Sequence, residues 1–210
     1  KFDIKRIESK ENLGPGLARL RAAQIALGNH IAWMDSDDIS LPMRLETLVI
    51  EKQKSECDVI GGFIREHLSN GKMLVRRVPA LPEAVAQYSK LRSPVNNVTA
   101  LLDKKFYLEV MSDIGFDSRV CEDYFVWMAI LAAGGKIRNV PKIMVEVDAG
   151  AGYAARRSFK IYFREILVIK KFYDNGWISA NHLICGAILR FAYRFFGQNF
   201  LILKVFRSFS

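Results

Sequence analysis

Cysteine is scarce in this sequence. Only Cys57, Cys121 and Cys185 occur among 210 residues, at wide spacing, and no Cys-x-x-Cys pair is present. An odd number of distant cysteines argues against a disulfide scaffold, and the missing cysteine–histidine cluster argues against a structural zinc site. The pattern favours a protein of a reducing compartment such as the cytoplasm.

Long hydrophobic runs, internal repeats and a signal peptide are missing too. The longest uncharged stretch near the C-terminus, Asn175–Leu189, contains Asn, Ser and His. It falls short of the ~20 mostly apolar residues that a membrane-spanning helix needs. Residues Lys1–Lys10 are charged and lack the apolar segment of a signal peptide. Because the sequence starts with Lys1 rather than Met, we expect a fragment whose true start is missing.

Positive charge is abundant but unevenly placed. The formal net charge is +9, yet residues 151–210 hold ten Lys and Arg against two acidic residues, Glu165 and Asp174. The excess therefore lies in the last third of the chain, which favours an anionic partner. A membrane surface is the expected partner; the aromatic content would permit nucleic acid, but no RNA- or DNA-binding motif is present, so none is expected.

Apolar segments of strand length alternate with amphipathic segments, which predicts an α/β layer architecture. The predicted strands are His30–Met34, Asp58–Arg65, Lys72–Val78, Asn97–Leu102 and Lys142–Val147. The predicted helices are Leu17–Leu27, Arg44–Ser55 with Ser40 as its cap, Pro82–Leu91, Lys105–Met111 and Glu122–Ala133. Asn12–Gly16 is predicted as a loop and Ser69–Gly71 as a turn.

The basic C-terminal third differs in character. Ser158–Tyr173 and Leu183–Phe206 combine aromatic and aliphatic residues with Lys and Arg. Such helices are typical of segments that lie in the membrane interface. The alternative is that they pack on the core with their cations in solvent.

The acidic cluster Asp35-Ser36-Asp37-Asp38 follows a predicted strand. Its carboxylates repel one another, so a cation is the natural partner, and oxygen ligands suit Mg²⁺ or Mn²⁺ shared with a diphosphate. Two alternatives are an acidic turn that caps the next helix and a phosphatase motif with Asp35 as the nucleophile. Ile39, where that phosphatase motif has Thr or Val, counts against the second alternative.

A second acidic pair, Glu122-Asp123, opens an otherwise apolar helix. A carboxylate there suits a general base that removes a proton from an acceptor hydroxyl; the alternative is a helix cap. Gly150–Ala155 imitates a dinucleotide-binding motif but lies too late in the chain, so we interpret it as a loop that presents Arg156 and Arg157 to phosphate. Two solvated arginines are the alternative.

Together these motifs resemble a family 2 glycosyltransferase of the GT-A fold, of the bacterial type that builds O-antigen, capsule and exopolysaccharide. The resemblance runs from about residue 8 to about residue 175. It is carried by Asn12-Leu13-Gly14, Ala18-Arg19, Gly28–Leu45, Arg92-Ser93-Pro94, Cys121–Tyr124 with Trp127, and the Gly152-Tyr153 to Arg157 segment.

The resemblance implies a mixed sheet and a role for each matching residue. Asp35 and Asp37 match the DxD motif, which holds Mn²⁺ or Mg²⁺ and the donor's ribose-diphosphate, with Asp37 as the direct ligand and Asp38 in support. Asp123 matches the base and Glu122 the neighbour that helps to position the acceptor. Asn12 and Arg19 match positions that line the donor site.

The implied reaction is inverting transfer of one hexose from a nucleotide-diphosphate sugar, with a UDP-sugar as the expected donor, to a polyprenyl-diphosphate-linked saccharide. No Gln-x-x-Arg-Trp motif is present, so processive synthesis is not expected. Residues 1–150 would form a partial catalytic domain, and residues 151–210 would dock peripherally on the cytoplasmic face of a bacterial plasma membrane. Arg156, Arg157 and Asn97 are weaker candidates for acceptor or phosphate contacts.

Three departures from the family pattern keep an alternative open. Two further strand–helix units would precede the Asn12 loop, Leu20 stands where Asn usually follows the arginine, and Asn97 stands where relatives have His. The alternative is an inactive, membrane-associated remnant that binds a sugar nucleotide or a partner.

Overall fold

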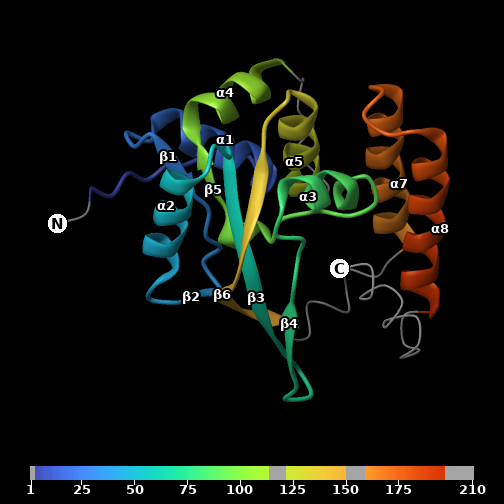
Figure 1. Ribbon diagram of the computed structural model, residues 1–210, viewed down its shortest axis with the longest axis horizontal. Coiled ribbons are helices and arrows are strands. Elements are labelled where there is room, and N and C mark those ends of the chain that lie inside the picture. Colours follow the sequence, from blue (N-terminus) through green and yellow to red (C-terminus); the bar gives the residue numbers. More distant parts are fainter. Residues whose placement is uncertain (1–2, 114–121, 150–158, 197–210) are drawn as a thin grey trace.

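The computed structural model describes residues 3–113, 122–149 and 159–196, and Figure 1 shows a mixed sheet flanked by helices. The six-stranded sheet has the order β1-β5-β3-β6-β2, with β4 paired to β3 outside this path. β3 and β6 are parallel, and the other pairs are antiparallel. The strands are β1 (His30–Ala32), β2 (Ile39–Ser40), β3 (Val59–Leu68), β4 (Met73–Arg76), β5 (Leu101–Asp103) and β6 (Ile137–Ala149).

Helices cover both faces of the sheet. Because side chains alternate along a strand, Val59 enters one buried cluster with α1, α4 and α5, whereas Ile60 enters another with α2. The predicted α/β layers are thus confirmed. The helices are α1 (Gly14–Ile25), α2 (Arg44–Lys54), α3 (Pro82–Ser89), α4 (Lys104–Asp113), α5 (Glu122–Ala132), α7 (Phe159–Asp174) and α8 (Ala180–Phe196), with a 3₁₀ turn η1 (Asn97–Thr99).

Helix α5 is the central helix of the molecule. Trp127 and Ile130 face the sheet cluster, whereas Tyr124 and Phe125 pack against α7 in a third cluster. Apolar residues on all sides of α5 match a helix buried on all sides. The helix that starts with Glu122-Asp123 is therefore held between the sheet and α7.

Several predicted boundaries were wrong. Ser40 caps no helix: it pairs with Val145 of β6, and α2 starts at Arg44 without a side-chain cap. Asn97–Thr99 form η1 rather than a strand. Both differences have the same cause: the residues that Ser40 and Thr99 contact, Val145 and Gly62, lie far away in the sequence.

Two other elements extend beyond the prediction. α1 already starts at Gly14, in the predicted loop, where a positive φ of 73° and the following proline open the helix. β6 is longer because its pairing jumps from Gly62–Val140 to Phe63–Ile143, which accommodates Pro141 in a bulge.

The turn at Ser69–Gly71 is confirmed, with Gly71 at a φ of 75°. Within the described residues, no helix combines the length and apolar character needed to cross a bilayer. Gly150–Arg157 and the end of the predicted Leu183–Phe206 helix lie outside the described residues.

A cavity of about 660 Å³ lies between α1 and the extended segment Asp3–Ser9. Its lining includes Arg21, Ile25 and Leu27 but none of the predicted site residues. The chemistry of the acidic motifs therefore has to be sought elsewhere, at the end of β1.

Candidate active site

Strand β1 delivers the acidic cluster to a fixed position. Just after the strand, the Trp33 N–H donates to the Ala100 carbonyl at 3.1 Å. The Trp33 ring is buried and lies between Tyr107 and Trp127, with ring centroids 5.6 and 5.1 Å away. Two residues later comes Asp35, so the packing of one indole sets where the carboxylates begin.

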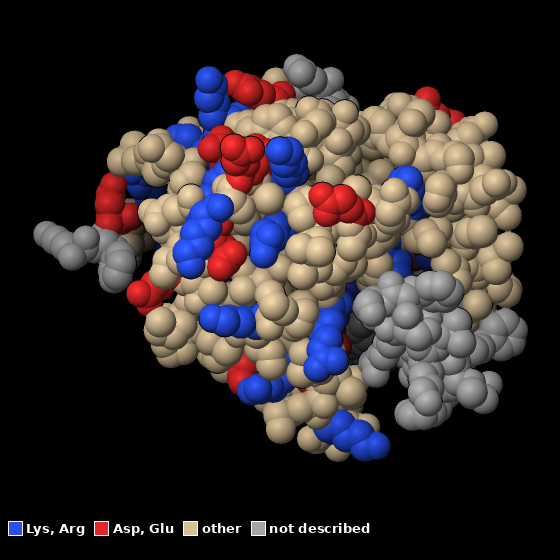
Figure 2. Space-filling model, viewed as in Figure 1, with Lys and Arg blue, Asp and Glu red and all other residues tan. Residues whose placement is uncertain are grey.

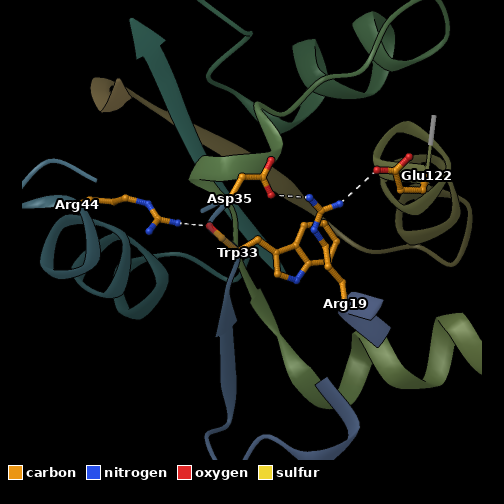
Figure 3. Close-up of polar contacts among 5 residues, drawn as sticks. All are labelled: Arg19, Trp33, Asp35, Arg44 and Glu122. Atoms are coloured by element: carbon orange, nitrogen blue, oxygen red, sulfur yellow. Dashed lines mark hydrogen bonds and ion pairs between the residues drawn. The ribbon is translucent and has the colours of Figure 1, made fainter. Parts of the chain in front are cut away.

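Arg44 also holds the backbone at Trp33, just before the acidic cluster. Its guanidinium is almost fully buried, and Nη2 donates to the Trp33 carbonyl at 2.5 Å (Figure 3). Burial lowers the pKa of Arg44, and Nε has no hydrogen-bond partner among the described residues. Arg44, which opens α2 after the loop and β2, thus reaches back to the residue that precedes the loop.

The acidic loop itself reaches solvent. Asp37 is exposed, whereas Asp35 and Asp38 are half-buried, and the Asp38 N–H lies 3.4 Å from the Asp35 carbonyl. No cluster of three or more His, Cys, Asp or Glu side chains forms a ready metal cage in the part of the chain described. One or two carboxylates at an open edge do fit Mg²⁺ or Mn²⁺ that takes its remaining ligands from phosphate and water.

Arg19 of α1 joins the two acidic motifs. Its Nη2 lies 2.7 Å from Asp35 Oδ1, and its Nη1 lies 3.3 Å from Glu122 Oε1. Its guanidinium also lies 5.4 Å from the centroid of the Trp33 ring. Figure 3 shows this contact set, which we call the Arg19 bridge. The bridge joins Arg19 to Asp35, which is 16 positions further along the sequence, and to Glu122, which is 103 positions further along.

Asp123 has the environment of a proton acceptor. Its Oδ1 accepts the Tyr124 N–H at 2.8 Å. Burial raises the pKa of Asp123, against the opposing effects of that hydrogen bond and of the charges of Arg76 and Arg19. Burial and the adjacent Asp123 charge likewise raise the pKa of Glu122, against the Arg19 bridge. Carboxylates with raised pKa values are suited to general base work near neutral pH.

Of the remaining predicted site residues, two are described by the structure and two are not. Asn12 is exposed, and its Oδ1 accepts the Gly14 N–H at 2.9 Å; no hydrogen bond links it to the Arg19 bridge in the described residues. Asn97 opens η1, and its Oδ1 is buried without a partner among the residues described. Arg156 and Arg157 lie outside the described residues.

Sequence reasoning missed Arg44 and the aromatic support of Trp33. The signal for Arg44 was a cation in the first turn of a helix that directly follows an acidic cluster. Arg76, whose charge lowers the pKa of Asp123, gave no sequence signal, because it reaches the site from the end of β4.

The chain is similar to known proteins in both sequence and fold. Residues 1–102 match the family model described as Glycosyl transferase family 2. Over these residues, just under half of the chain, the protein is similar to the family 2 glycosyltransferases. The GT-A fold expected from the resemblance is confirmed by structure: Staphylococcus aureus TarS in complex with UDP-GlcNAc superposes with a TM-score of 0.61 at 18% identity, over 87% of this chain and 54% of that one.

Two curated relatives extend the comparison. The amylovoran biosynthesis glycosyltransferase AmsE of Erwinia amylovora is 28% identical over 151 residues, which are 70% of this chain and 55% of that protein. An Escherichia coli UDP-Gal:α-D-GlcNAc-diphosphoundecaprenol β-1,3-galactosyltransferase is 27% identical over 99% of this chain and 77% of its own length. The chain thus spans little more than half the length of the AmsE relative.

The raised pKa of Asp123 predicts how stability depends on pH. The native state keeps a proton that the unfolded chain releases near the ordinary aspartate pKa of 3.8, so this stabilising contribution is lost as pH rises through the folded-state pKa. Asp123→Asn should therefore be more stable than the parent protein at about pH 7, and the difference should shrink as pH falls toward about 4. Urea unfolding across this range measures it. The exposed Asp37→Asn is the control, and a pH-independent gain at Asp123 would contradict the burial argument.

The Arg19 bridge predicts a specific energetic coupling. Lys cannot span both carboxylates, so Arg19→Lys should lower the free energy of unfolding, and Arg19→Met should lower it by about 1–2 kcal/mol, discounted for partial exposure. A double-mutant cycle with Glu122→Gln should give a non-zero interaction energy. Arg21→Met, an exposed arginine on the same helix, is the matched control and should change stability little. Strict additivity of Arg19→Met and Glu122→Gln would show that the bridge carries no energy.

Arg44 predicts a local effect on the acidic loop. Arg44→Met removes a buried charge together with the hydrogen-bond donor to the Trp33 carbonyl. The free energy of global unfolding should therefore fall by less than the free energy of local opening that protects the loop amides from exchange. Leu48→Ala, in the same helix, should cost about 3 kcal/mol without selectively exposing the loop. Hydrogen exchange at residues 34–38 compares the two variants. If the two variants lost loop protection in the same proportion to their loss of global stability, a specific role for Arg44 would be refuted.

Proposed function

We propose that this protein transfers one hexose, with inversion and without processive elongation, from a UDP-sugar to a saccharide carried on a polyprenyl diphosphate. The observation that carries the proposal is the Arg19 bridge. The bridge holds Asp35, a proposed donor-binding carboxylate, close to Glu122, which precedes the proposed base Asp123.

The proposed roles follow from position. Asp37 and Asp35 would hold a divalent cation together with the donor diphosphate, and that cation would offset the charge of the departing nucleoside diphosphate. Arg19 adds positive charge at the same place. Asp123 takes the proton from the acceptor hydroxyl, and Glu122, fixed by Arg19, orients the acceptor. Asp38, Asn12 and Asn97 remain proposed supporting residues.

The substrate classes are supported by relatives rather than by this chain alone. The E. coli galactosyltransferase and a second E. coli relative, WfaP, are named for UDP-sugar donors and diphosphoundecaprenol-linked GlcNAc acceptors. TarS has been solved with UDP-GlcNAc. These names support a UDP-sugar donor and a lipid-diphosphate acceptor here.

A lipid-linked acceptor places the proposed reaction at a membrane. We propose peripheral attachment to the cytoplasmic face of a bacterial plasma membrane, with residues 151–210 as the attached region and no role for nucleic acid. Arg156 and Arg157 remain proposed phosphate contacts there.

A second candidate is a non-catalytic, membrane-associated remnant that binds a sugar nucleotide or a partner. It is favoured by two departures from the family pattern within the chain, Leu20 after Arg19 and Asn97 at the start of η1. The two candidates share donor binding and differ in turnover, so one experiment separates them.

The test measures UDP-sugar binding and sugar transfer in the same samples, with Mn²⁺ or with EDTA. Asp37→Ala should lose metal-dependent donor binding and transfer. Asp123→Asn should retain donor binding and lose transfer by at least about 100-fold, the usual contribution of a general base. Glu109→Gln, an exposed residue of α4, is the control. Donor binding without any transfer would support a remnant that binds a sugar nucleotide. The absence of both binding and transfer would refute the transferase and leave only a remnant that binds a partner.

A further inference from the structure

Helices α7 and α8 leave an apolar surface uncovered. Phe163 and Leu167 of α7 are 62% and 65% exposed, and Ile184 and Ile188 of α8 are 57% and 61% exposed. We call these four residues the outer stripe. Exposed apolar residues scattered singly need no explanation, but four on two adjoining helices do.

The outer stripe lies opposite the face that packs on the protein. In α7 the buried Ile169 and Phe172 join the cluster with α5, whereas Phe163 and Leu167 repeat at a spacing of four on the other side. The two helices lie side by side in Figure 1, and Tyr162 contacts Phe191 with ring centroids 6.0 Å apart. The stripe is therefore not needed for the fold.

Cations flank the apolar residues on α7. Arg164 and Lys170 are exposed on either side of the Phe163–Leu167 line, and Lys170 is paired with Asp174 at 2.6 Å. The right-hand part of Figure 2, where these helices lie, is mainly uncharged surface with isolated Lys and Arg. An apolar line with flanking cations is the arrangement of a helix that lies in a membrane interface.

The sign of the charge selects the partner. Residues 151–210 carry ten Lys and Arg and two acidic residues. Near a bilayer of anionic lipids each such cation contributes about 1 kcal/mol of attraction, whereas an uncharged apolar partner gains nothing from them. We propose that the outer stripe of α7 and α8 is the surface with which the protein rests on an anionic lipid bilayer. This inference rests on the proposed function, because a lipid-linked acceptor requires contact with a membrane.

The surface is connected to the site by direct packing. Tyr124, next to Asp123, contacts Phe172 of α7 with ring centroids 5.0 Å apart. The Arg190 guanidinium of α8 lies 5.6 Å from the centroid of the Tyr124 ring. A membrane under the outer stripe would therefore lie at a fixed distance from the proposed base.

The test is flotation with vesicles of phosphatidylcholine alone or with about one third phosphatidylglycerol. The parent protein should bind the anionic vesicles only, and Ile184→Asp/Ile188→Asp should bind at least tenfold more weakly, since each change exposes a charge where an apolar side chain should insert. Leu45→Asp, 51% exposed on α2, is the matched control and should bind like the parent. Arg164→Glu is a second variant, outside the apolar line, and should weaken anionic binding on its own.

A parallel assay distinguishes this inference from the proposed function. Transfer to a water-soluble acceptor with a short lipid should be unchanged in the Ile184→Asp/Ile188→Asp variant, whereas transfer to acceptor in vesicles should fall at least tenfold. Vesicle binding without transfer to either acceptor refutes only the proposed function. Equal vesicle binding by the variant, binding to neutral vesicles alone, or a parent dimer that the variant abolishes without any vesicle binding overturns the inference.

Discussion

One guanidinium group connects the parts of this molecule that matter for chemistry. Arg19 has two donor nitrogens in a fixed plane, one 2.7 Å from Asp35 and the other 3.3 Å from Glu122. A single ammonium could not hold both carboxylates in this way. The contact requires α1, the end of β1 and the start of α5 to meet within a few ångströms, so the packing of three elements converges on one side chain.

A second arginine makes that convergence possible. Arg44 binds the Trp33 carbonyl, and the Trp33 ring lies under the Arg19 guanidinium at 5.4 Å. The acidic loop is thus fixed through its backbone by one cation and through Asp35 by another. Burying Arg44 costs desolvation, as its lowered pKa shows, and two arginines near a run of carboxylates offset part of the repulsion among them.

The sequence allowed some of this to be predicted. Local signals sufficed for the strand before Asp35, the turn at Ser69–Gly71 and the helix that starts with Glu122, because each depends on neighbouring residues. The same signals failed for Ser40, whose partner is Val145, and for Arg44, whose partner is a backbone carbonyl. Asp35 and Glu122 could be predicted as members of two motifs, but their common partner Arg19 depends on how α1 packs.

The position of α5 links the proposed base to the helices of the C-terminal region by direct packing. Trp127 of this helix contacts Trp33 under the acidic loop, while Phe125, two residues earlier and on another side of the helix, contacts Phe172 and Trp177. The interior is close-packed, so a displacement of α7 must move α5 or open a void. Asp123, at the first turn of α5, is therefore held both by the sheet that carries the proposed donor carboxylates and by the helices proposed to rest on the lipid. A donor that is water-soluble and an acceptor that is membrane-bound would then meet at a carboxylate whose position both sides determine.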